Sequence, residues 1–553
     1  MLSSFFIFTV ISDPDTMKKY NALLSLFFVL LFYNQGKAQE IMNFSTDLPL
    51  IIIDTEGKNI VDDPKIQAKM KIVNNASGLN RFTDSPNDYN GYIGIELRGS
   101  SSINYPQKPY LFETRDALGQ NQDASILGLP KEKDWILLSN YNDKSLMRNI
   151  LGYQMFEKLG NYAPRAKLVD VVLNNEYRGI YVLTEKIKQD SNRVNIAKLK
   201  AEDISGDQLT GGYIFKIDYW NSSNSWESPY SPVNYPGYKI RYVYHDPDWD
   251  ELNYQQKNYI STYVTSFEKV LYSSNFADAT QGYPKYIDVK SFIDYFLVSE
   301  ISRNNDGYKK SQYFHKDRNG KIVAGPVWDF DWAWKNINEC YIFKAINGSG
   351  WSYQINDCHP DVNSNGWMVR LLQDQNFADK VNCSYFSARA NQLSDASIFQ
   401  MIDSLYNVVK NAQVRHFQKW QILGKNVGAP EVDAQPVTYA GEVEKLRNWI
   451  IMRLAWLDKN MPGKCSTLTN VELADDSQIT IYPSPATDML NIISHQPLSA
   501  IQIYDLTGKN TAFDFEENSG LIRLNVSNFP PGMYILKLVG PNGKSVSEKL
   551  IIQ

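Results

Sequence analysis

Two short acidic segments contain the residues whose types and spacing best suit chemistry. The first is Asn304-Asn305-Asp306-Gly307, and the second is Asp329-Phe330-Asp331. A β-hairpin is predicted between them, with strands at 312–315 and 321–323 joined by a turn at 317–320. Such a hairpin would return the chain toward the first segment, so we expect the two acidic segments to lie together.

Carboxylates grouped in this way suit phosphoryl transfer. One carboxylate has to orient the acceptor hydroxyl and accept its proton, while others hold Mg²⁺ ions that bridge the phosphates of the nucleotide. Asp329 and Asp331 are two residues apart on a segment predicted to be extended, so they would point the same way and could share a metal. Phe330 would then pack on the other side. The alternative is structural, with an ordinary turn in the first segment and a solvated strand end in the second.

A loop rich in Ser and Gly forms a second candidate cluster. Arg98-Gly99-Ser100-Ser101 lies between predicted strands at 92–98 and 110–114, and Lys108 follows it. The backbone amides, hydroxyls and two cations of such a loop could cover the oxygens of a triphosphate. Because turns of this composition are common, an ordinary connection between two strands is the alternative.

Two further charges stand on mostly apolar elements. Arg148 is near the start of a predicted helix, and Glu185 is on a predicted strand. Both are candidates for cofactor binding, because a charge on an apolar element needs a partner. A structural ion pair explains either charge equally well.

The elements that would position these residues follow from the hydrophobic pattern. A helix is predicted up to Leu159, with Asp143 or Ser145 as its N-cap and Gly160 at its end, and another helix follows Asp288. From about residue 252 the pattern is largely helical, and more helices are predicted from about 368 to 457. Strands are predicted at 48–54, 92–98, 110–114, 167–173, 179–186 and 212–217. This order predicts an α+β enzyme with a cleft between two lobes.

The last 80 or so residues have a different pattern. Six short strands separated by turns predict a small all-β domain, an Ig-like sandwich, over 478–553. The strands are predicted at 479–483, 489–493, 501–506, 521–526, 533–538 and 549–552. The polar stretch 466–477 is predicted to link this domain to a main domain at 39–465.

The N-terminal residues 1–38 have the layout of a signal peptide. Lys18 and Lys19 precede an apolar run at 22–33, and Gly36-Lys37-Ala38 provides the small residues of a cleavage site. The charged region begins at Met17, which is a candidate start of translation. No segment approaches the ~20 apolar residues of a transmembrane helix, so we expect an exported protein without a membrane span.

Export makes the four cysteines candidates for disulfides. Cys340 and Cys358 lie in one short segment, which favours pairing between them and leaves Cys383 to pair with Cys465. Four cysteines allow three connectivities, so the other two pairings stay open.

Composition narrows the function classes. The net charge of the 553 residues is −5, and no basic block or stripe is present, so we expect no nucleic-acid partner. The five histidines are scattered without the spacing of a zinc site, and no G-x-S-x-G motif is present. The aromatic content of 35 Tyr, 25 Phe and 12 Trp is typical of large cores and also of proteins that handle glycans.

Several of these motifs together resemble the spore-coat CotH kinase family. The matching stretches are GIELRGSSS (94–102), KDWILLSNYNDKSLMRN (133–149), NNEYRGIYVLTEKI (174–187), NNDGY (304–308) and GPVWDFDWAW (325–334). They occur in the order expected for that family and span about residues 45–460.

The resemblance implies a secreted, remote relative of protein kinases with a two-lobed protein-kinase-like fold. It implies ATP and Mg²⁺ (or Mn²⁺) as cofactors, Asp306 as the catalytic acid and Asp329 as the metal-binding acid. It also implies that the loop from Arg98 to Lys108 faces the phosphates. The sequence departs from its relatives at 112–114, where many carry a further Lys, and at 310–312, where kinases have an Asn for a second metal.

The C-terminal domain is similar to the type IX secretion sorting domains of Bacteroidetes. The motifs are at 481–486, 503–509, 531–534 and 549–552. The similarity implies recognition by the type IX secretion machinery, passage through the periplasm and delivery to the cell surface or medium.

These observations together predict a secreted protein kinase that transfers the ATP γ-phosphate to hydroxyl side chains of an exported or surface protein. Two alternatives stay open. One is a non-catalytic surface or adhesion protein on a kinase-like fold, since ATP is scarce outside the cytoplasm. The other is a glycan-active hydrolase in which Asp306 and Asp329 flank the sugar.

Overall fold

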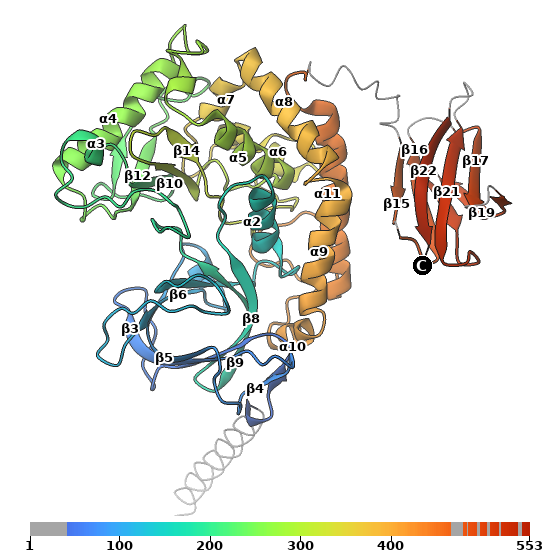
Figure 1. Ribbon diagram of the computed structural model, residues 1–553, viewed down its shortest axis with the longest axis horizontal. Coiled ribbons are helices and arrows are strands. Elements are labelled where there is room, and N and C mark those ends of the chain that lie inside the picture. The colour runs from blue at the N-terminus through green and yellow to red at the C-terminus, as the bar shows by residue number, and fades with distance from the viewer. Residues whose placement is uncertain are drawn as a thin grey trace, which may run out of the picture. The chain divides into compact units, whose positions relative to one another are not determined.

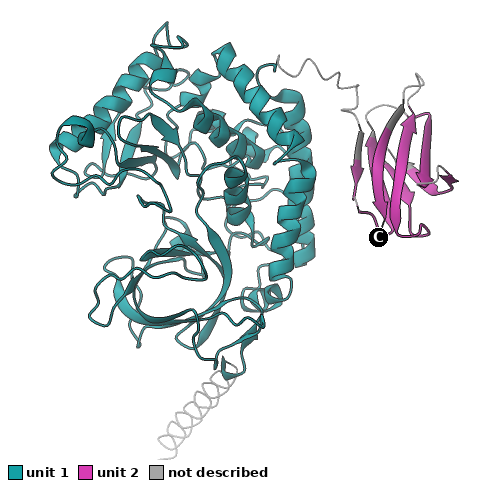
Figure 2. Ribbon diagram, in the orientation of Figure 1, with its two compact units in different colours: residues 1–465 teal, residues 466–553 magenta. Residues whose placement is uncertain are grey.

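A computed structural model describes residues 41–465 and, between 479 and 552, all residues except 484, 495–497, 506–508, 519–520 and 540–544. The chain divides into two compact units, residues 1–465 and 466–553 (Figures 1 and 2). Unit 1 mixes helices and strands, and unit 2 contains strands, which confirms the α+β class and the all-β C-terminal region. The predicted signal peptide at 1–38 and the predicted linker at 466–477 lie outside the described residues.

The N-terminal part of unit 1 is a closed barrel of seven strands (Figure 1). Neighbouring strands of the barrel pair antiparallel, except for β2 and β8, which are parallel and close the barrel. Apolar side chains fill the interior, as in other small barrels. In order around the barrel, the strands are β2 (Leu50–Asp54), β3 (Ile66–Val73), β5 (Tyr89–Leu97), β6 (Tyr110–Arg115), β7 (Asp134–Ser139), β9 (Glu176–Glu185) and β8 (Ala166–Leu173).

Strands β3 and β7 were not predicted, and neither was the closure. Two further short strands, β1 (Ser45–Thr46) and β4 (Asn80–Arg81), pair with each other in a separate antiparallel sheet. The turn predicted at 174–177 is shorter in the structure. Only Asn174 and Asn175 separate β8 from β9, and both have positive φ values, 51° and 61°.

Helix α2 (Arg148–Lys158) follows β7, and its N-cap is Met147, not Asp143 or Ser145 as predicted. The Asp143 carboxylate accepts hydrogen bonds from the backbone N–H groups of Met147 (3.0 Å) and Arg148 (2.8 Å), so it satisfies donors that the first helical turn leaves free. Gly160, with φ 89°, ends the helix as predicted.

A five-stranded sheet forms the next layer of unit 1, in the order β11-β12-β10-β13-β14. Its last two strands are the predicted hairpin that joins the two acidic segments. The strands are β10 (Tyr213–Ile217), β11 (Ser225–Glu227), β12 (Arg241–Asp246), β13 (Gln312–Lys316) and β14 (Ile322–Ala324).

Helices complete unit 1, and they share one large apolar core with α2 and the five-stranded sheet. Helix α5 begins as predicted, because the Asp288 side chain accepts the N–H of Ser291 at 2.8 Å. The longer helices are α4 (Tyr254–Leu271), α5 (Val289–Ser302), α8 (Gln375–Ala390), α9 (Asp395–Val409), α10 (Ala412–Lys419) and α11 (Tyr439–Asn460). The shorter helical segments are η1 (Ser102–Asn104), α3 (Gly206–Leu209), η2 (Tyr283–Lys285), α6 (Tyr341–Lys344), η3 (Ser352–Cys358) and α7 (Trp367–Leu371).

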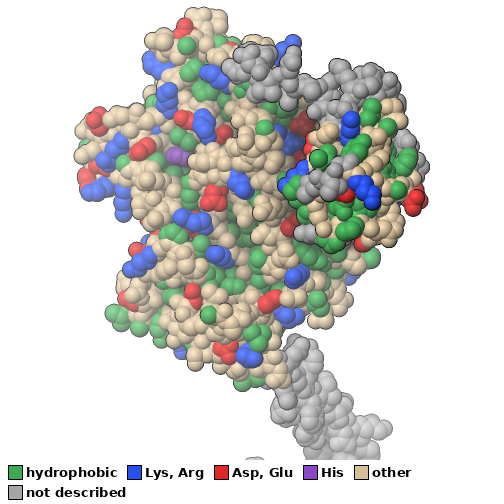
Figure 3. Space-filling view, turned by 45° about the vertical axis from the view of Figure 1, so that its right-hand side comes forward, with side chains coloured by type: hydrophobic (Ala, Val, Ile, Leu, Met, Phe, Trp, Pro, Cys, Tyr) green, Lys and Arg blue, Asp and Glu red, His purple; other side chains and the backbone are tan. Residues whose placement is uncertain are grey.

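Both predicted disulfides, Cys340–Cys358 and Cys383–Cys465, are present. Within the described ranges, none of the helices has the length and apolar character that a membrane crossing requires. On the visible face of unit 1, basic and acidic side chains are interspersed (Figure 3).

Unit 2 consists of two four-stranded antiparallel sheets that contribute to one apolar core. One sheet has the order β15-β16-β20-β19 and the other β18-β17-β21-β22. The strands are β15 (Ile479–Tyr482), β16 (Met489–Ser494), β17 (Ala500–Asp505), β18 (Asn510–Thr511), β19 (Asp514–Asn518), β20 (Leu521–Asn525), β21 (Gly532–Val539) and β22 (Ser545–Ile552).

Candidate active site

A cavity of about 630 Å³ in unit 1 contains most of the predicted site residues. The Arg98–Ser102 loop after β5 forms one part of its wall, and the two acidic segments form another. The charged and polar residues that line it include Arg98, Ser100, Ser101, Asn149, Lys216, Asp218, Asn305, Asp306, Lys309, Lys310, Asp329, Asp331, Glu339 and Asp361. The hairpin β13–β14 therefore brings the acidic segments together.

The three aspartates are close enough to influence one another. Burial raises the pKa of Asp306, and the negative charge of Asp331 adds to the effect. Burial, followed by the charges of Asp331 and Asp306, raises the pKa of Asp329 well above its ordinary value. Crowded carboxylates with few compensating charges favour a bound proton or a bound cation.

The chain does not run extended through 329–331 as predicted. Asp329 has a left-handed backbone with φ 64°. The Phe330 N–H donates to Asn149 Oδ1 on α2 at 2.8 Å. The Phe330 ring packs against Gly152 so closely that a Cβ added there would lie 2.5 Å from the ring. The Asn304 side chain donates to the carbonyl of Asp329 at 3.1 Å. The turn lets Phe330 enter the core while the flanking carboxylates line the same cavity.

Asp306 lies on the loop after α5. Its N–H donates to Asn304 Oδ1 at 3.2 Å. Lys309 Nζ is 3.5 Å from Asp306 Oδ1 and 3.2 Å from Glu339 Oε1. The charges of Lys309 and Lys310 offset part of the effect of burial on the Asp306 pKa.

Lys310 points to a different partner on the cavity wall. Its Nζ is 2.9 Å from Asp361 Oδ2 and 2.7 Å from the Tyr219 hydroxyl. Sequence reasoning missed both lysines as site residues. Their position three and four residues after Asp306 was the available signal, whereas nothing in the sequence linked them to Glu339 or Asp361.

The Ser/Gly loop is another part of the cavity wall. Gly99 has φ 104°, and a Cβ there would lie 2.2 Å from Ser102 Oγ, so the loop requires glycine at this position. The Arg98 guanidinium lies over the Trp328 ring at 5.5 Å. Lys216, on β10, also lines the cavity and forms a 2.7 Å ion pair with Asp218. Lys216 is a third cation, after Lys309 and Lys310, that the sequence analysis did not identify.

Two predicted cofactor-binding cations are not brought to the cavity. Lys108 Nζ donates to the Ile103 carbonyl at 2.7 Å, so it closes the loop on itself. Arg148 is buried, forms an ion pair with Asp143 and donates from Nε to the Ala333 carbonyl at 3.0 Å. Internal partners hold both side chains, and neither residue lines the cavity, so the structure does not bring either of them to this site.

Glu185 is also away from the cavity. It is fully buried and accepts hydrogen bonds from Arg165 Nε and the Tyr162 hydroxyl, both at 3.0 Å. Glu185 therefore forms a structural ion pair with Arg165, which is the alternative that the sequence analysis kept open.

The donor set at the acidic wall suits a hard cation that has few protein ligands. Among the described residues, no group of three or more His, Cys, Asp or Glu side chains is arranged to hold a metal by itself. Asp329 and Asp331 line the cavity as a pair, and the nearby Asn305 Oδ1 is buried without a hydrogen-bond partner among the described residues. Mg²⁺ commonly takes one or two carboxylates together with water and substrate phosphates, so these residues fit it.

A second cavity of about 460 Å³ lies near the end of β9. Its charged lining consists of Lys133, Lys186, Lys188, Lys198 and Lys200 together with Glu113, Asp134, Asp246, Asp248 and Glu251. Because the two signs balance, the lining favours a polar ligand without a strong preference for its charge.

Comparison with known proteins gives two family matches. The profile described as CotH kinase protein matches residues 95–457, and the profile described as secretion system C-terminal sorting domain matches residues 480–553. The first match includes both acidic segments and the Ser/Gly loop.

Individual relatives are more distant. Inner spore coat protein H of Bacillus subtilis (strain 168) is 21% identical over 280 residues, which cover 50% of this chain and 64% of that protein. The chain therefore spans slightly less than two thirds of that relative. The crystal structure of CopC from Methylosinus trichosporium OB3b covers 14% of this chain and 93% of its own, with 14% identity and a TM-score of 0.11, which is too low to inform the fold.

Proposed function

The chain belongs to the CotH kinase protein family, and we propose that it is an exported phosphotransferase that uses ATP and Mg²⁺ (or Mn²⁺). The observation that carries the proposal is the meeting of Asp306, Asp329 and Asp331 with the Arg98–Ser102 loop in one cavity of about 630 Å³. That volume is in the range of sites for cofactor-sized ligands.

In this proposal the fold is two-lobed and kinase-like. The barrel would form one lobe, and the five-stranded sheet with its helices would form the other. Carboxylates from the second part and phosphate-binding groups from the first would then meet across the cavity, which is the division of labour that phosphoryl transfer needs.

The three cavity aspartates have proposed roles. Asp306 would accept the proton of the acceptor hydroxyl, because it is the acid beside two lysines and at the end of α5. Asp329 and Asp331 would hold Mg²⁺, and a bound Mg²⁺ supplies neutralisation of the phosphate charge.

The cations and hydroxyls on the opposite wall would position the nucleotide. Ser100 and Ser101 would donate hydrogen bonds to phosphate oxygens, and Arg98 and Lys216 would neutralise their charge. Lys216 would provide the cation that the β6 segment 112–114 lacks in comparison with relatives.

The proposed acceptor is a Ser, Thr or other hydroxyl on an exported or surface protein. The sorting domain indicates type IX secretion to the cell surface or medium, so an acceptor would be met there or on the way. Contact with the secretion machinery would be made by unit 2.

The test is transfer of label from γ-labelled ATP in the presence of Mg²⁺ or Mn²⁺, with residues 40–553 as enzyme and a mixture of envelope proteins as acceptors. Asp306→Asn keeps the side-chain shape but cannot accept the proton, so we expect transfer to fall by at least about 100-fold while nucleotide binding persists. Asp329→Asn should instead raise the Mg²⁺ concentration needed for half-maximal nucleotide binding.

The variants separate the alternatives. Full activity of Asp306→Asn would remove its assignment as the proton acceptor. Absence of both transfer and nucleotide binding in the unsubstituted protein would favour a non-catalytic surface protein. Cleavage of glycans that is lost in both variants, without ATP binding, would favour the hydrolase.

A further inference from the structure

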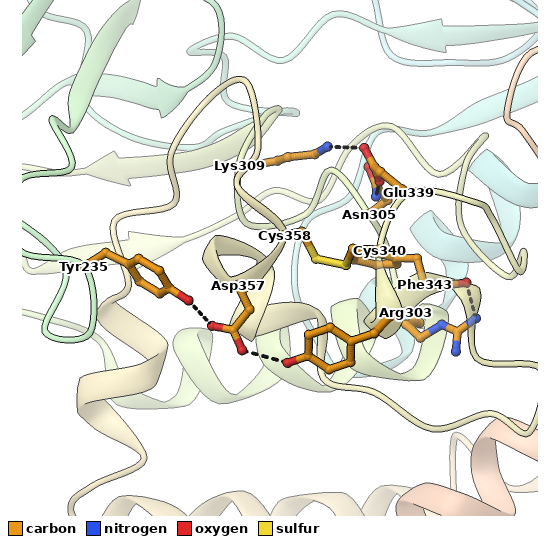
Figure 4. Close-up of a disulfide and its surroundings, with 10 residues drawn as sticks. Tyr235, Arg303, Asn305, Lys309, Glu339, Cys340, Phe343, Asp357 and Cys358 are labelled. Carbon is orange, nitrogen blue, oxygen red and sulfur yellow. Dashed lines mark hydrogen bonds and ion pairs between the residues drawn. A yellow bond between two sulfur atoms is a disulfide. The ribbon is translucent and has the colours of Figure 1, made fainter.

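The Cys340–Cys358 disulfide lies at the edge of the candidate active site (Figure 4). It joins the two ends of a segment that begins at Glu339 and ends at Asp361. Glu339, Cys358 and Asp361 all line the cavity. The disulfide therefore holds together two stretches of cavity wall that are separated by an 18-residue excursion of the chain.

Each end of this segment contacts one of the two lysines, Lys309 and Lys310, on the loop that follows α5. Glu339 Oε1 is 3.2 Å from Lys309 Nζ, and the other oxygen of Glu339 accepts a hydrogen bond from the Asn305 amide (Figure 4). Asp361 Oδ2 is 2.9 Å from Lys310 Nζ. These carboxylates thus orient both cations that follow Asp306.

The middle of the segment is anchored independently of the disulfide. The Arg303 guanidinium, which is buried, donates to the carbonyls of Phe343 (3.1 Å), Ala345 (2.9 Å) and Ser349 (2.7 Å). Beside the disulfide, Asp357 accepts hydrogen bonds from the hydroxyls of Tyr235 (2.5 Å) and Tyr341 (2.7 Å), so a solvent-exposed hydrogen bond also joins the two ends. Loss of the disulfide should therefore loosen the two ends without unfolding the segment.

We propose that the Cys340–Cys358 disulfide, together with Glu339 and Asp361, forms a positioning element that holds Lys309 and Lys310 beside Asp306. This inference rests on the proposed function of the cavity. It means that the site is complete only when the disulfide is formed, so the enzyme gains full activity after it reaches an oxidising compartment. Cys358 lines the cavity, which gives a small thiol reductant access to the bond.

The other disulfide provides a matched control. Cys383 lies on α8 and pairs with Cys465 at the end of unit 1, and neither residue lines the cavity. The double variants Cys340→Ser/Cys358→Ser and Cys383→Ser/Cys465→Ser each remove one disulfide and add two hydroxyls.

We expect kcat to fall about tenfold or more in Cys340→Ser/Cys358→Ser, with KM for ATP changed by less than about twofold, because displaced groups near the reacting centre affect the chemical step most. Cys383→Ser/Cys465→Ser should keep the kcat of the unsubstituted protein. Dithiothreitol should lower the activity of the unsubstituted protein and of the control equally. It transfers two electrons and two protons to the disulfide, which breaks the S–S bond and leaves two thiols and oxidised dithiothreitol.

Reoxidation completes the test. Oxidised glutathione accepts two electrons from the thiol pair and is released as two reduced glutathione molecules, and activity should return. Dithiothreitol should have no further effect on Cys340→Ser/Cys358→Ser. Unchanged kcat in that variant, or an equal loss in the control, would overturn the proposal.

Hydrogen exchange measured by mass spectrometry tests positioning apart from activity. Amides at 304–311 should exchange at least about threefold faster in Cys340→Ser/Cys358→Ser than in the control, because local opening becomes easier when anchoring contacts are lost. If the unsubstituted protein transfers no phosphate, the proposed function fails, whereas unchanged exchange at 304–311 overturns the positioning role itself.

Discussion

At the scale of single residues, the acidic side chains that line the cavity differ in how closely basic side chains compensate their charge. Asp306 has lysine neighbours that are themselves held by Glu339 and Asp361. The pair Asp329 and Asp331 has weaker compensation, and the pKa of Asp329 is raised by burial and by its acidic neighbours. This difference supports a division in which one acid handles protons and the other two bind a cation.

Gly152 is a small residue on which this arrangement depends. We predict that Gly152→Ala lowers the melting temperature, although alanine favours helix by about 1 kcal/mol, because its Cβ would overlap the Phe330 ring and overpacking costs about 1–3 kcal/mol. The displaced ring should also shift the flanking aspartates and weaken Mg²⁺-dependent nucleotide binding. Thermal unfolding and Mg²⁺ titration check both effects.

A double variant isolates the steric cause. Phe330→Leu presents a smaller side chain to helix α2. The double variant Gly152→Ala/Phe330→Leu should therefore lose less free energy of unfolding than the sum of the losses in the two single variants. Additive effects would show that Gly152 does not act through Phe330.

At the scale of elements, three of them determine where the acids meet. Helix α5 ends at Ser302, and the left-handed backbone of the following residue, Arg303 (φ 42°), turns the chain into the first acidic segment. The hairpin β13–β14 returns it to the second. Helix α2 supplies Asn149 and the space beside Gly152 that receive Phe330. A change in any of these elements should move one acid relative to the others.

Helix α4 buries a carboxyl group that couples stability to pH. Glu268 accepts hydrogen bonds from Ser228 (2.7 Å), Tyr242 (2.6 Å) and Trp367 (3.1 Å), yet burial raises its pKa from 4.5 to about 7. The folded protein therefore binds a proton more tightly than the unfolded chain. The stability contributed by this group is fully present below pH 4.5 and is lost as the pH rises toward 7.

We predict that Glu268→Gln removes this dependence. The free energy of unfolding of the variant should increase relative to that of the unsubstituted protein between pH 5 and pH 8, by up to about 3 kcal/mol, because only the unsubstituted protein loses stability over this range. Urea unfolding at several pH values measures the difference. Glu444→Gln, at an exposed position on α11, is the control and should show a constant difference. A constant difference for Glu268→Gln as well would contradict the prediction.

At the scale of the whole molecule, the two units have separate cores and separate family matches. Unit 1 ends at Cys465, whose disulfide to Cys383 closes it upon itself. Unit 2 has its own buried residues, including Leu490, Ile503 and Leu536. This separation suits a catalytic unit joined to a delivery unit.

We predict that removal of 466–553 changes the melting temperature of unit 1 by less than about 2 °C and its transfer activity by less than about twofold, because the two units have separate cores and independent sites contribute additively. In a host with type IX secretion, the shortened protein should stay in the periplasm. Cell fractionation and surface labelling measure delivery. Surface delivery of the shortened protein would show that unit 2 is not the sorting signal.

Local patterns in the sequence determined much of this protein. The Asp288 cap, the end of α2 at Gly160 and the hairpin at 312–324 depend on residues within a few positions of each other, so propensity and turn chemistry predict them. Six of the eight described strands of unit 2 followed from the same signals, whereas β18 and β19 were not predicted. Family motifs identified the CotH domain and the sorting domain, and the spacing of the cysteines favoured the two disulfides that the structure contains.

Only the tertiary structure decided the features that depend on long-range contacts. The parallel pairing of β2 with β8 joins segments far apart in the chain, and no local pattern encodes such a closure. Asp329 has a left-handed backbone where Phe330 packs against α2, and Asp361 contacts Lys310 at the end of a segment that the Cys340–Cys358 disulfide closes. Arg148 and Glu185 satisfy internal partners. In each case burial and packing between distant segments outweigh local preference, and these are the forces that a single sequence leaves unspecified.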